Sequence, residues 1–553
     1  MDLDLIIINA TIVTATEILP PNLSIGINSG IIVAIALSLP AAPSTRIIDA
    51  EGAYVTPGGV DSHVHLHQDN APTGDKWESG SRSALCGGNT TILAFASQQR
   101  KDASLFPVIE EYHNRARDQS YIDYGFHLII SNPTPEILGT ADGENKGELK
   151  QMVEQEGITS VKLYMTYPAY RLGDREMLEV MLRCREVGMT VMIHAENADM
   201  IDLITTRLLS STHTLPKYHA LARPQIAETE ATYRAISLST LTSTPILIVH
   251  MSSPVALSHA RKAQSKQMLP IHAETCPHYM FLKSERLAAQ RHPFEGAGTE
   301  DGHKHEAEGK DEWAGARHIC APPLRHSDDD LQSVWDSITN GTVTVISSDH
   351  APSRYAHPLG KQKPIHEFSS GKTKVPPSFA NTPNGLPGIE TRLPLLFSAA
   401  TDTAAPPGRR LSLPKFVELT SSNPAKMYGF GDRKGSLAPG YDADIVIWYP
   451  PSHTSVAKKV KITNEMLHHS IDYTPFEGFE VTNWPRYVLL RGEVKWDRDI
   501  EMEGLERGEG YGKGILGKTG DGRFLKRGKG EILVGRVGVD PAGMKDGERE
   551  RWL

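Results

Sequence analysis

Two histidines stand two residues apart near the start of the chain, in Gly58-Gly59-Val60-Asp61-Ser62-His63-Val64-His65. Residues i and i+2 of a β-strand point to the same face, so both imidazoles can reach one metal ion. Imidazole suits zinc and its neighbours in the first transition row. The alternative is a strand end with two structural histidines, because this spacing is common on its own.

Four further positions within or after apolar runs carry residues that can serve such a site. Lys162 lies inside the strand-like run 160–167, and a lysine is rarely buried without a partner. Its alternative is a lysine paired with a carboxylate of the core. His194, His250 and Asp349 each follow a β-branched, apolar run. A single histidine at a strand end is usually structural, but the repetition at several strand ends favours a shared site.

The runs that carry these residues belong to a regular series. Short apolar, β-branched runs alternate with helix-sized spacers, which predicts parallel βαβ units. Eight such units over roughly 300 residues predict a closed (β/α)8 barrel, whose active site forms at the carboxyl ends of the strands. The main alternative is a doubly wound open sheet. The predicted strands are 54–65, 90–96, 125–130, 159–165, 190–195, 245–251, 268–274 and 342–347, and the clearest predicted helices are 105–118, 175–187 and 226–238.

The number of ligand-type residues favours two metals. Four histidines and Asp349 exceed what one tetrahedral catalytic zinc uses when it keeps an open position. Two cations need a bridging anion, whereas a lysine amine is a cation. Lys162 can act as the bridge only if its amine is carboxylated, which spacing alone does not show.

The remaining segments predict the domain organisation. Residues 1–56 contain short β segments, and we expect them to fold with residues 430–500 into one composite β domain. The barrel would then span 57–429. The tail 501–553 is predicted to be an extension that serves as an arm for contacts between subunits. Two segments interrupt the barrel pattern: a polar insertion at 291–312, and a loop at 353–384 that would overhang the barrel mouth.

Composition excludes several classes of protein. The chain has 553 residues, 39% of them hydrophobic, and a net charge of −9, which argues against a nucleic-acid surface. No apolar run reaches the ~18 residues of a membrane span. The acidic start does not predict a signal peptide. The four cysteines are scattered without CxxC spacing, so we expect a reducing, cytoplasmic location.

Eight motifs together make a specific resemblance. The chain resembles the dihydropyrimidinase/hydantoinase branch of the cyclic amidohydrolases, in the amidohydrolase superfamily, with the motifs in family order over about residues 1–500. They are Gly-Gly-Val-Asp-Ser-His-Val-His (58–65), Val-Lys-Leu-Tyr-Met-Thr-Tyr (161–167), His-Ala-Glu-Asn (194–197), Val-His-Met-Ser-Ser (249–253), Glu-Thr-Cys-Pro-His-Tyr (274–279), Pro-Pro-Leu-Arg (322–325), Ser-Asp-His-Ala-Pro (348–352) and Tyr-Thr-Pro-Phe-Glu-Gly (473–478).

The resemblance implies a (β/α)8 barrel with a β-sandwich domain from both chain ends. It also implies two zinc ions per subunit, bridged by N6-carboxylated Lys162 and a hydroxide. The implied partners are a small cyclic amide substrate and further copies of the chain, as a dimer or tetramer. One zinc would be held by His63, His65 and Asp349, and the other by His194 and His250.

The implied reaction is hydrolysis of a ring C–N bond in a 5,6-dihydropyrimidine, a hydantoin or a related imide. The bridging hydroxide would attack the ring amide carbonyl. The Tyr167 hydroxyl would stabilise the oxyanion, and Asp349 would move the proton to the leaving nitrogen.

Departures from the family pattern concern the substrate. Ala321 stands where many members have serine, at a position whose backbone contacts the cyclic amide. Pro387 stands at a frequent asparagine position and offers a carbonyl but no N–H. His67 stands where dihydroorotases place an arginine for a substrate carboxylate. Allantoinase, dihydroorotase and a non-catalytic dihydropyrimidinase-like binding protein remain the alternatives, and loops 66–78, 167–175 and 353–384 are expected to set substrate size.

Four other histidines are not predicted to bind metal. His272 precedes a family motif whose strand lacks a metal ligand, so we interpret it as structural. His303 and His305 lie in the polar insertion and are expected at the surface. His350 follows Asp349 on the opposite strand face and is expected to support the site.

Overall fold

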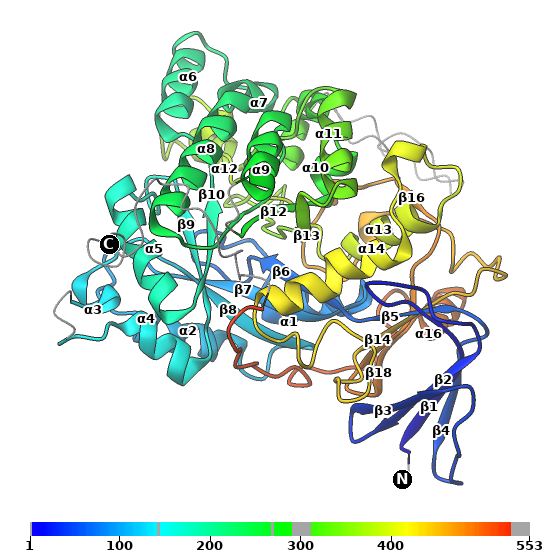
Figure 1. The fold of residues 1–553 in the computed structure, drawn as a ribbon. Helices are drawn as coiled ribbons and strands as arrows, with labels where there is room; N and C mark the ends of the chain where they lie inside the picture. The colour runs from blue at the N-terminus through cyan, green and yellow to red at the C-terminus, as the bar shows by residue number, and fades with distance from the viewer. Residues whose placement is uncertain (1–2, 141–143, 267–269, 290–310, 532–553) are drawn as a thin grey trace.

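The core of the molecule is a sheet of eight parallel strands that closes on itself (Figure 1). The computed structural model describes residues 3–140, 144–266, 270–289 and 311–531. A parallel bridge between Val64 and His350 joins the two ends of the sheet. The predicted (β/α)8 barrel is therefore confirmed, and the open sheet is excluded. Its strands are β6 (Gly59–Val64), β7 (Asn89–Ser97), β8 (Asp123–Ile129), β9 (Ser160–Tyr164), β10 (Thr190–His194), β11 (Ile246–Ile248), β12 (Ile271–Thr275) and β13 (Val343–Ile346).

The predicted first strand, 54–65, is in fact two strands that part at Gly58. A Cβ atom at Gly58 would lie 2.1 Å from Thr90 Oγ1, and one at Gly59 would lie 2.7 Å from Asn89 Oδ1. Only glycine lets the chain pass this close to β7 and turn from one sheet into the other. As a result β5 (Tyr54–Pro57) belongs to a second sheet, and β6 begins the barrel.

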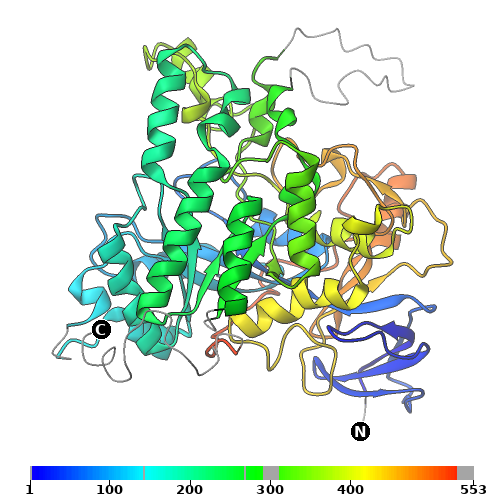
Figure 2. The same ribbon diagram turned by 45° about the horizontal axis from the view of Figure 1, so that its top comes forward.

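Helices cover the outside of the barrel, and Figure 2 shows several of them running roughly parallel along it. None of the helices within the described ranges is long and apolar enough to cross a membrane. The barrel helices are α1 (Trp77–Cys86), α2 (Phe106–Ala116), α5 (Asp174–Val187), α8 (Gln225–Thr242), α9 (Pro254–Lys266), α11 (Asp328–Thr339) and α13 (Arg392–Thr401). The other helices up to residue 427 are α3 (Pro135–Leu138), α4 (Glu148–Gln151), α6 (Ala198–Ser210), α7 (His219–Ala222), α10 (Pro277–Phe281), α12 (Lys363–Ser369), α14 (Leu413–Val417) and α15 (Asn423–Met427).

Strands from both ends of the chain form the second sheet, as predicted. Figure 1 shows the blue strands β1–β4 projecting from the barrel at the lower right. The strand order is β18-β17-β14-β5-β1-β2-β3, with β4 paired to β1. The proposed boundaries at residues 56, 430 and 500 stay predictions. The strands are β1 (Leu5–Ile12), β2 (Leu23–Asn28), β3 (Ile31–Ala36), β4 (Arg46–Asp49), β14 (Ile445–Trp448), β17 (Pro485–Leu490) and β18 (Glu493–Asp497), and β15 (Val460–Lys461) with β16 (Glu480–Val481) forms a small separate ladder.

The described part of the tail runs along the barrel. Phe524 forms a parallel bridge with Tyr124 of β8, and Leu525 is buried. The Arg527 guanidinium donates to the carbonyl of Phe126. Burial lowers the pKa of Arg527 to about 9. Residues 524–527 are thus packed against the barrel. Residues 532–553 and most of the insertion 291–312 lie outside the described residues, and the subunit arm stays a prediction.

A buried ion network joins the barrel to the C-terminal segment. His468 Nδ1 donates to Glu390 Oε1 (2.8 Å), and its Nε2 donates to Glu501 Oε1 (3.3 Å) on α16 (Arg498–Glu506). Potential ligand atoms of Cys86, Glu390 and His468 lie within 4.8 Å of one another. Because both nitrogens of His468 already donate to carboxylates, we interpret the group as an ion-pair network. Burial lowers the pKa of His468, but Cys86 and Glu390 outweigh burial and raise it well above its ordinary value.

We expect His468→Gln to lower the free energy of unfolding by about 3 kcal/mol at pH 6, because it leaves two buried carboxylates without their cation. The folded-state pKa of His468 is raised, so the stabilisation is complete below the unfolded-state pKa of about 6.5 and is lost as pH rises through the folded-state value. Urea unfolding of both proteins from pH 5 to 9 measures the difference. The exposed His357→Gln is the control, and a difference that stays constant across this range would contradict the assignment.

Candidate active site

The barrel brings the predicted ligand residues to one cavity. His63, Lys162 and His194 lie on β6, β9 and β10, while His250 and Asp349 follow β11 and β13. All these ends meet at the carboxyl edge of the barrel, because the strands are parallel. The cavity has a volume of about 400 Å³ and is lined by His63, His65, Gln68, Asn70, Ala71, Ser97, Gln99, Ile129, Lys162, Tyr164, Tyr167, Pro168, Ala169, Tyr170, His194, His250, Ala321, Asp349, Ala351, Ser353, Pro383, Asn384 and Gly385.

The potential ligand atoms face one another at short distances. Asp349 Oδ1 lies 3.1 Å from His63 Nε2 and 3.6 Å from His65 Nε2. Lys162 Nζ lies 3.1 Å from His63 Nε2. The ligand atoms of His63, His65 and Asp349 all lie within 4.8 Å of one another, which is a spacing that a single metal ion can span.

In three of the four histidines, a hydrogen bond from one ring nitrogen to a side-chain oxygen orients the imidazole. His63 Nδ1 donates to Glu274 Oε1 (2.6 Å), and His65 Nδ1 donates to Gln68 Oε1 (2.9 Å). His194 Nε2 donates to Glu196 Oε2 (2.8 Å). Each contact fixes the tautomer and leaves the other nitrogen as a ligand, as is typical of metal-bound histidines. His250 Nδ1 is buried without a hydrogen-bond partner among the described residues.

Burial dominates the electrostatics of the cluster. It lowers the pKa of Lys162 to about 8, against the opposing effect of Asp349 and Glu274. It raises the pKa of Asp349 to about 7 and that of Glu274 to about 8. Burial also lowers the pKa of His63 well below its ordinary value. Neutral imidazoles are the form that binds metal, so this donor set fits a cation.

Several site residues have backbone conformations that side chains disfavour. The φ angles of Tyr167, His250 and Asp349 are +66°, +40° and +46°. Such conformations cost of order 1–3 kcal/mol each and persist where the surrounding structure fixes them, which is typical of functional sites.

The predicted substrate contacts are only partly brought to the cavity. Ala321 lines it, whereas Pro387 lies beside a separate small space next to His350 and His469. The reason is a β-bridge between His350 and Leu386, which turns the following residue away from the cavity. Asn384 and Gly385 line the cavity instead.

His67 also faces away from the catalytic cavity. The loop after His65 separates two spaces: Gln68, Asn70 and Ala71 line the catalytic cavity, while His67 and Asp69 line an outer cavity of about 890 Å³. The position at which dihydroorotases carry an arginine is thus turned outward in this chain.

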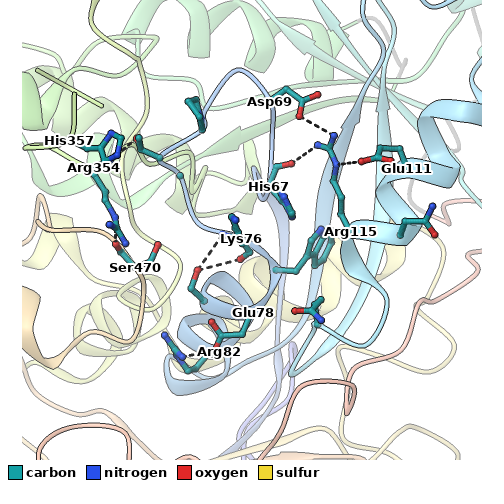
Figure 3. A pocket seen from close by; sticks show the side chains of 17 residues that line it. His67, Asp69, Lys76, Glu78, Arg82, Glu111, Arg115, Arg354, His357 and Ser470 are labelled. Atoms are coloured by element: carbon teal, nitrogen blue, oxygen red, sulfur yellow. Dashed lines mark hydrogen bonds and ion pairs between the residues drawn. The ribbon is translucent and has the colours of Figure 1, made fainter. Parts of the chain in front are cut away.

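Arg115 of α2 holds this loop from the outside. Its guanidinium donates to the His67 carbonyl (2.7 Å) and pairs with Asp69 (2.9 Å) and with Glu111 (2.9 Å). Figure 3 shows the Arg115 guanidinium beside the loop, directed at both His67 and Asp69. Arg115 therefore ties the barrel helix to the loop whose other face lines the catalytic cavity.

Sequence reasoning missed the residues that orient the histidines. The Glu274 carboxylate was hidden in a motif whose strand we expected to carry no ligand, although a carboxylate inside an apolar strand was a usable signal. Gln68 and Glu196 carried no such signal. His350 supports the site through Asp75 (3.0 Å), which in turn accepts from Ser79 (2.7 Å) at the start of α1. His272 is not part of the cavity lining, and His303 and His305 lie outside the described residues.

Comparison with known proteins matches the sequence to a family and the fold to solved structures. Residues 54–495 match the Amidohydrolase family. D-hydantoinases of Ralstonia pickettii and Geobacillus stearothermophilus are 34% and 35% identical to the chain; each comparison covers 95% of the chain, and 99% and 97% of the relatives. A crystal structure of dihydropyrimidinase from Brevibacillus agri NCHU1002 is 32% identical, with a TM-score of 0.77 over 95% of this chain and 98% of that one.

The chain therefore belongs to the amidohydrolase family. Within this family it falls in the D-hydantoinase/dihydropyrimidinase branch. It is a cyclic amidohydrolase of that type, as the motifs predicted.

We expect Arg115→Ala to raise KM for a cyclic amide about fivefold and to change kcat less, because it releases the loop that lines the cavity without touching the ligand residues. Steady-state kinetics measures the split. Arg117→Ala, exposed just beyond the same helix, is the matched control. Unchanged KM in Arg115→Ala would show that the loop is held by its other contacts.

Proposed function

We propose that the chain hydrolyses a ring C–N bond of a 5,6-dihydropyrimidine, a hydantoin or a related imide, using two zinc ions. The observation that carries the proposal is the convergence of six ligand-type side chains on one cavity: five are buried and His65 is partly buried, and they lie on, or directly after, five different strands. Isolated histidines at strand ends do not account for this arrangement, since burying so many ionisable groups together is unfavourable without a compensating cation.

His63, His65 and Asp349 would hold one zinc, and His194 and His250 the other, with Lys162 between them. Burial favours the neutral amine of Lys162, which is the form that reacts with carbon dioxide. Carboxylation would convert this amine into an anion able to bridge two metals. When bound, the zinc pair would lower the pKa of a water and polarise the substrate carbonyl.

Two side chains would carry out the remaining steps, which are proton transfer and stabilisation of the oxyanion. Asp349 would take a proton from the attacking water and deliver it to the ring nitrogen that leaves. The Tyr167 hydroxyl lines the same cavity and would donate to the carbonyl oxygen on which negative charge develops. Burial raises the pKa of Tyr167 far above neutrality, so it remains a phenol and keeps its proton for this role.

The cavity supports a small, uncharged ring as substrate. Its volume suits a small molecule. The described lining residues include no arginine, and Lys162, their one amine cation, lies among the ligands. A dihydroorotate carboxylate would therefore lack a counter-charge, which favours dihydropyrimidines and hydantoins over that substrate. We further propose, from the resemblance, a homo-oligomer in the cytoplasm.

We expect about two zinc ions per purified chain, and we expect Asp349→Asn to keep much of this zinc while kcat falls at least about 100-fold, because the amide cannot carry the proton. Elemental analysis and kinetics on the same preparation measure both quantities. A chain that holds no zinc would instead support a non-catalytic binding protein, and near-normal turnover of Asp349→Asn would remove this residue from the proton path.

A side-by-side ring-opening assay tests the substrate class. With dihydrouracil, hydantoin, succinimide, allantoin and dihydroorotate at equal concentrations, we expect dihydrouracil or hydantoin to show the highest kcat/KM. We expect dihydroorotate to be the poorest, because the cavity offers its carboxylate no free cation. A clear preference for dihydroorotate or allantoin would overturn the proposed substrate class.

A further inference from the structure

Contacts from other segments of the chain orient the Tyr167 side chain. Its backbone lies in the left-handed region, and no described residue forms a hydrogen bond with its hydroxyl, which is left for the cavity. The ring must be held by its faces and edges. It packs against Tyr164 and His194, with ring centroids 5.9 Å and 5.3 Å away. A third contact comes from Arg223, whose guanidinium carbon lies 5.3 Å from the ring centroid.

Arg223 is itself fixed from two directions. Its side chain is 10% exposed, and Nη1 lies 2.5 Å from Glu196 Oε2. Its backbone carbonyl accepts from Arg325 Nη1 (3.0 Å), and Arg325 pairs with Glu228 (2.6 Å). Arg223 is not among the residues that line the cavity, and its guanidinium lies over the Tyr167 ring. A guanidinium over an aromatic face attracts the ring, most strongly where water is excluded.

One carboxylate oxygen links this arginine to the metal ligands. Glu196 Oε2 also accepts from His194 Nε2 (2.8 Å). Arg223 and His194 donate to the same oxygen. Two short hydrogen bonds therefore fix the guanidinium that contacts the Tyr167 ring relative to His194. A lysine in place of Arg223 would keep the charge but could not present a planar group to the carboxylate and the ring together.

We propose that Arg223 is a positioning residue that, through the Glu196 carboxylate, fixes the Tyr167 ring relative to His194. The proposal rests on the proposed role of Tyr167 as oxyanion donor. A hydroxyl that acts only on the transition state affects kcat, so displacement of the ring should lower kcat and leave KM nearly unchanged.

A double-mutant cycle tests this. We expect Arg223→Lys to lower kcat about tenfold in the native background and to change it less than about twofold in a Tyr167→Phe background, because the hydroxyl to be positioned is then missing. Zinc content and KM should stay near native values. Arg234→Lys, which loses a similar carboxylate partner on α8, is the matched control. Equal losses in both backgrounds, or no loss in either, would overturn the proposal.

A second measurement does not depend on catalysis. In metal-free protein labelled with 3-fluorotyrosine, the Tyr167 ¹⁹F resonance is assigned by its absence in Tyr167→Phe. We expect Arg223→Lys to shift or broaden this resonance, and Arg234→Lys to leave it unchanged. The double variant Glu196→Gln with Arg223→Gln leaves no lone buried charge and should show the same change if Arg223→Lys does not fold. An unaltered resonance would overturn the positioning role, whereas absence of ring-opening activity in the native chain would overturn only the proposed function.

Discussion

Desolvation of the ligand cluster at the carboxyl edge of the barrel constrains the rest of the structure. Lys162, His63 and Glu274 are completely buried, and Asp349 nearly so. Charged groups removed from water are costly unless they are paired or bind a cation. The barrel meets this cost by bringing opposite and neutral groups within hydrogen-bonding distance, and a metal pair would complete the compensation. The same residues therefore contribute to both the stability and the proposed function of the protein.

Hydrogen-bond acceptors around the ligand cluster fix the orientation of its histidine side chains. Glu274, Gln68 and Glu196 each hold one histidine, and each arises from a different part of the barrel mouth. The same set of acceptors supports one of the strained backbone positions, because the His250 N–H donates to Glu274 Oε1 (3.2 Å). The Glu196–Arg223 pair extends the same principle from the ligands to the residue that would stabilise the oxyanion.

The parts of the chain outside the barrel hold its edges and floor. Gly58 allows a single extended segment to leave the second sheet and enter the barrel immediately before His63. His468 joins Glu390 of the barrel to Glu501 of the C-terminal helix through buried charges. The tail then passes along β8, where Arg527 bonds the backbone carbonyl of Phe126. The composite organisation thus connects distant chain segments to the strands that carry the ligands.

The strand pattern and the identity of the ligand-type residues follow from the amino-acid sequence, because apolar periodicity and residue chemistry are local properties. The sequence therefore predicted the barrel, the contribution of both chain ends to a second sheet, and the six residues that the cavity brings together. Contacts between distant segments appear only in the folded chain. There Glu274 orients His63, His67 and Pro387 turn away from the cavity while Asn384 and Gly385 line it, and the Arg223 guanidinium lies over the Tyr167 ring. Such contacts join segments far apart in the chain. No local sequence pattern specifies which face of a loop will line a cavity, or which distant side chain it will contact.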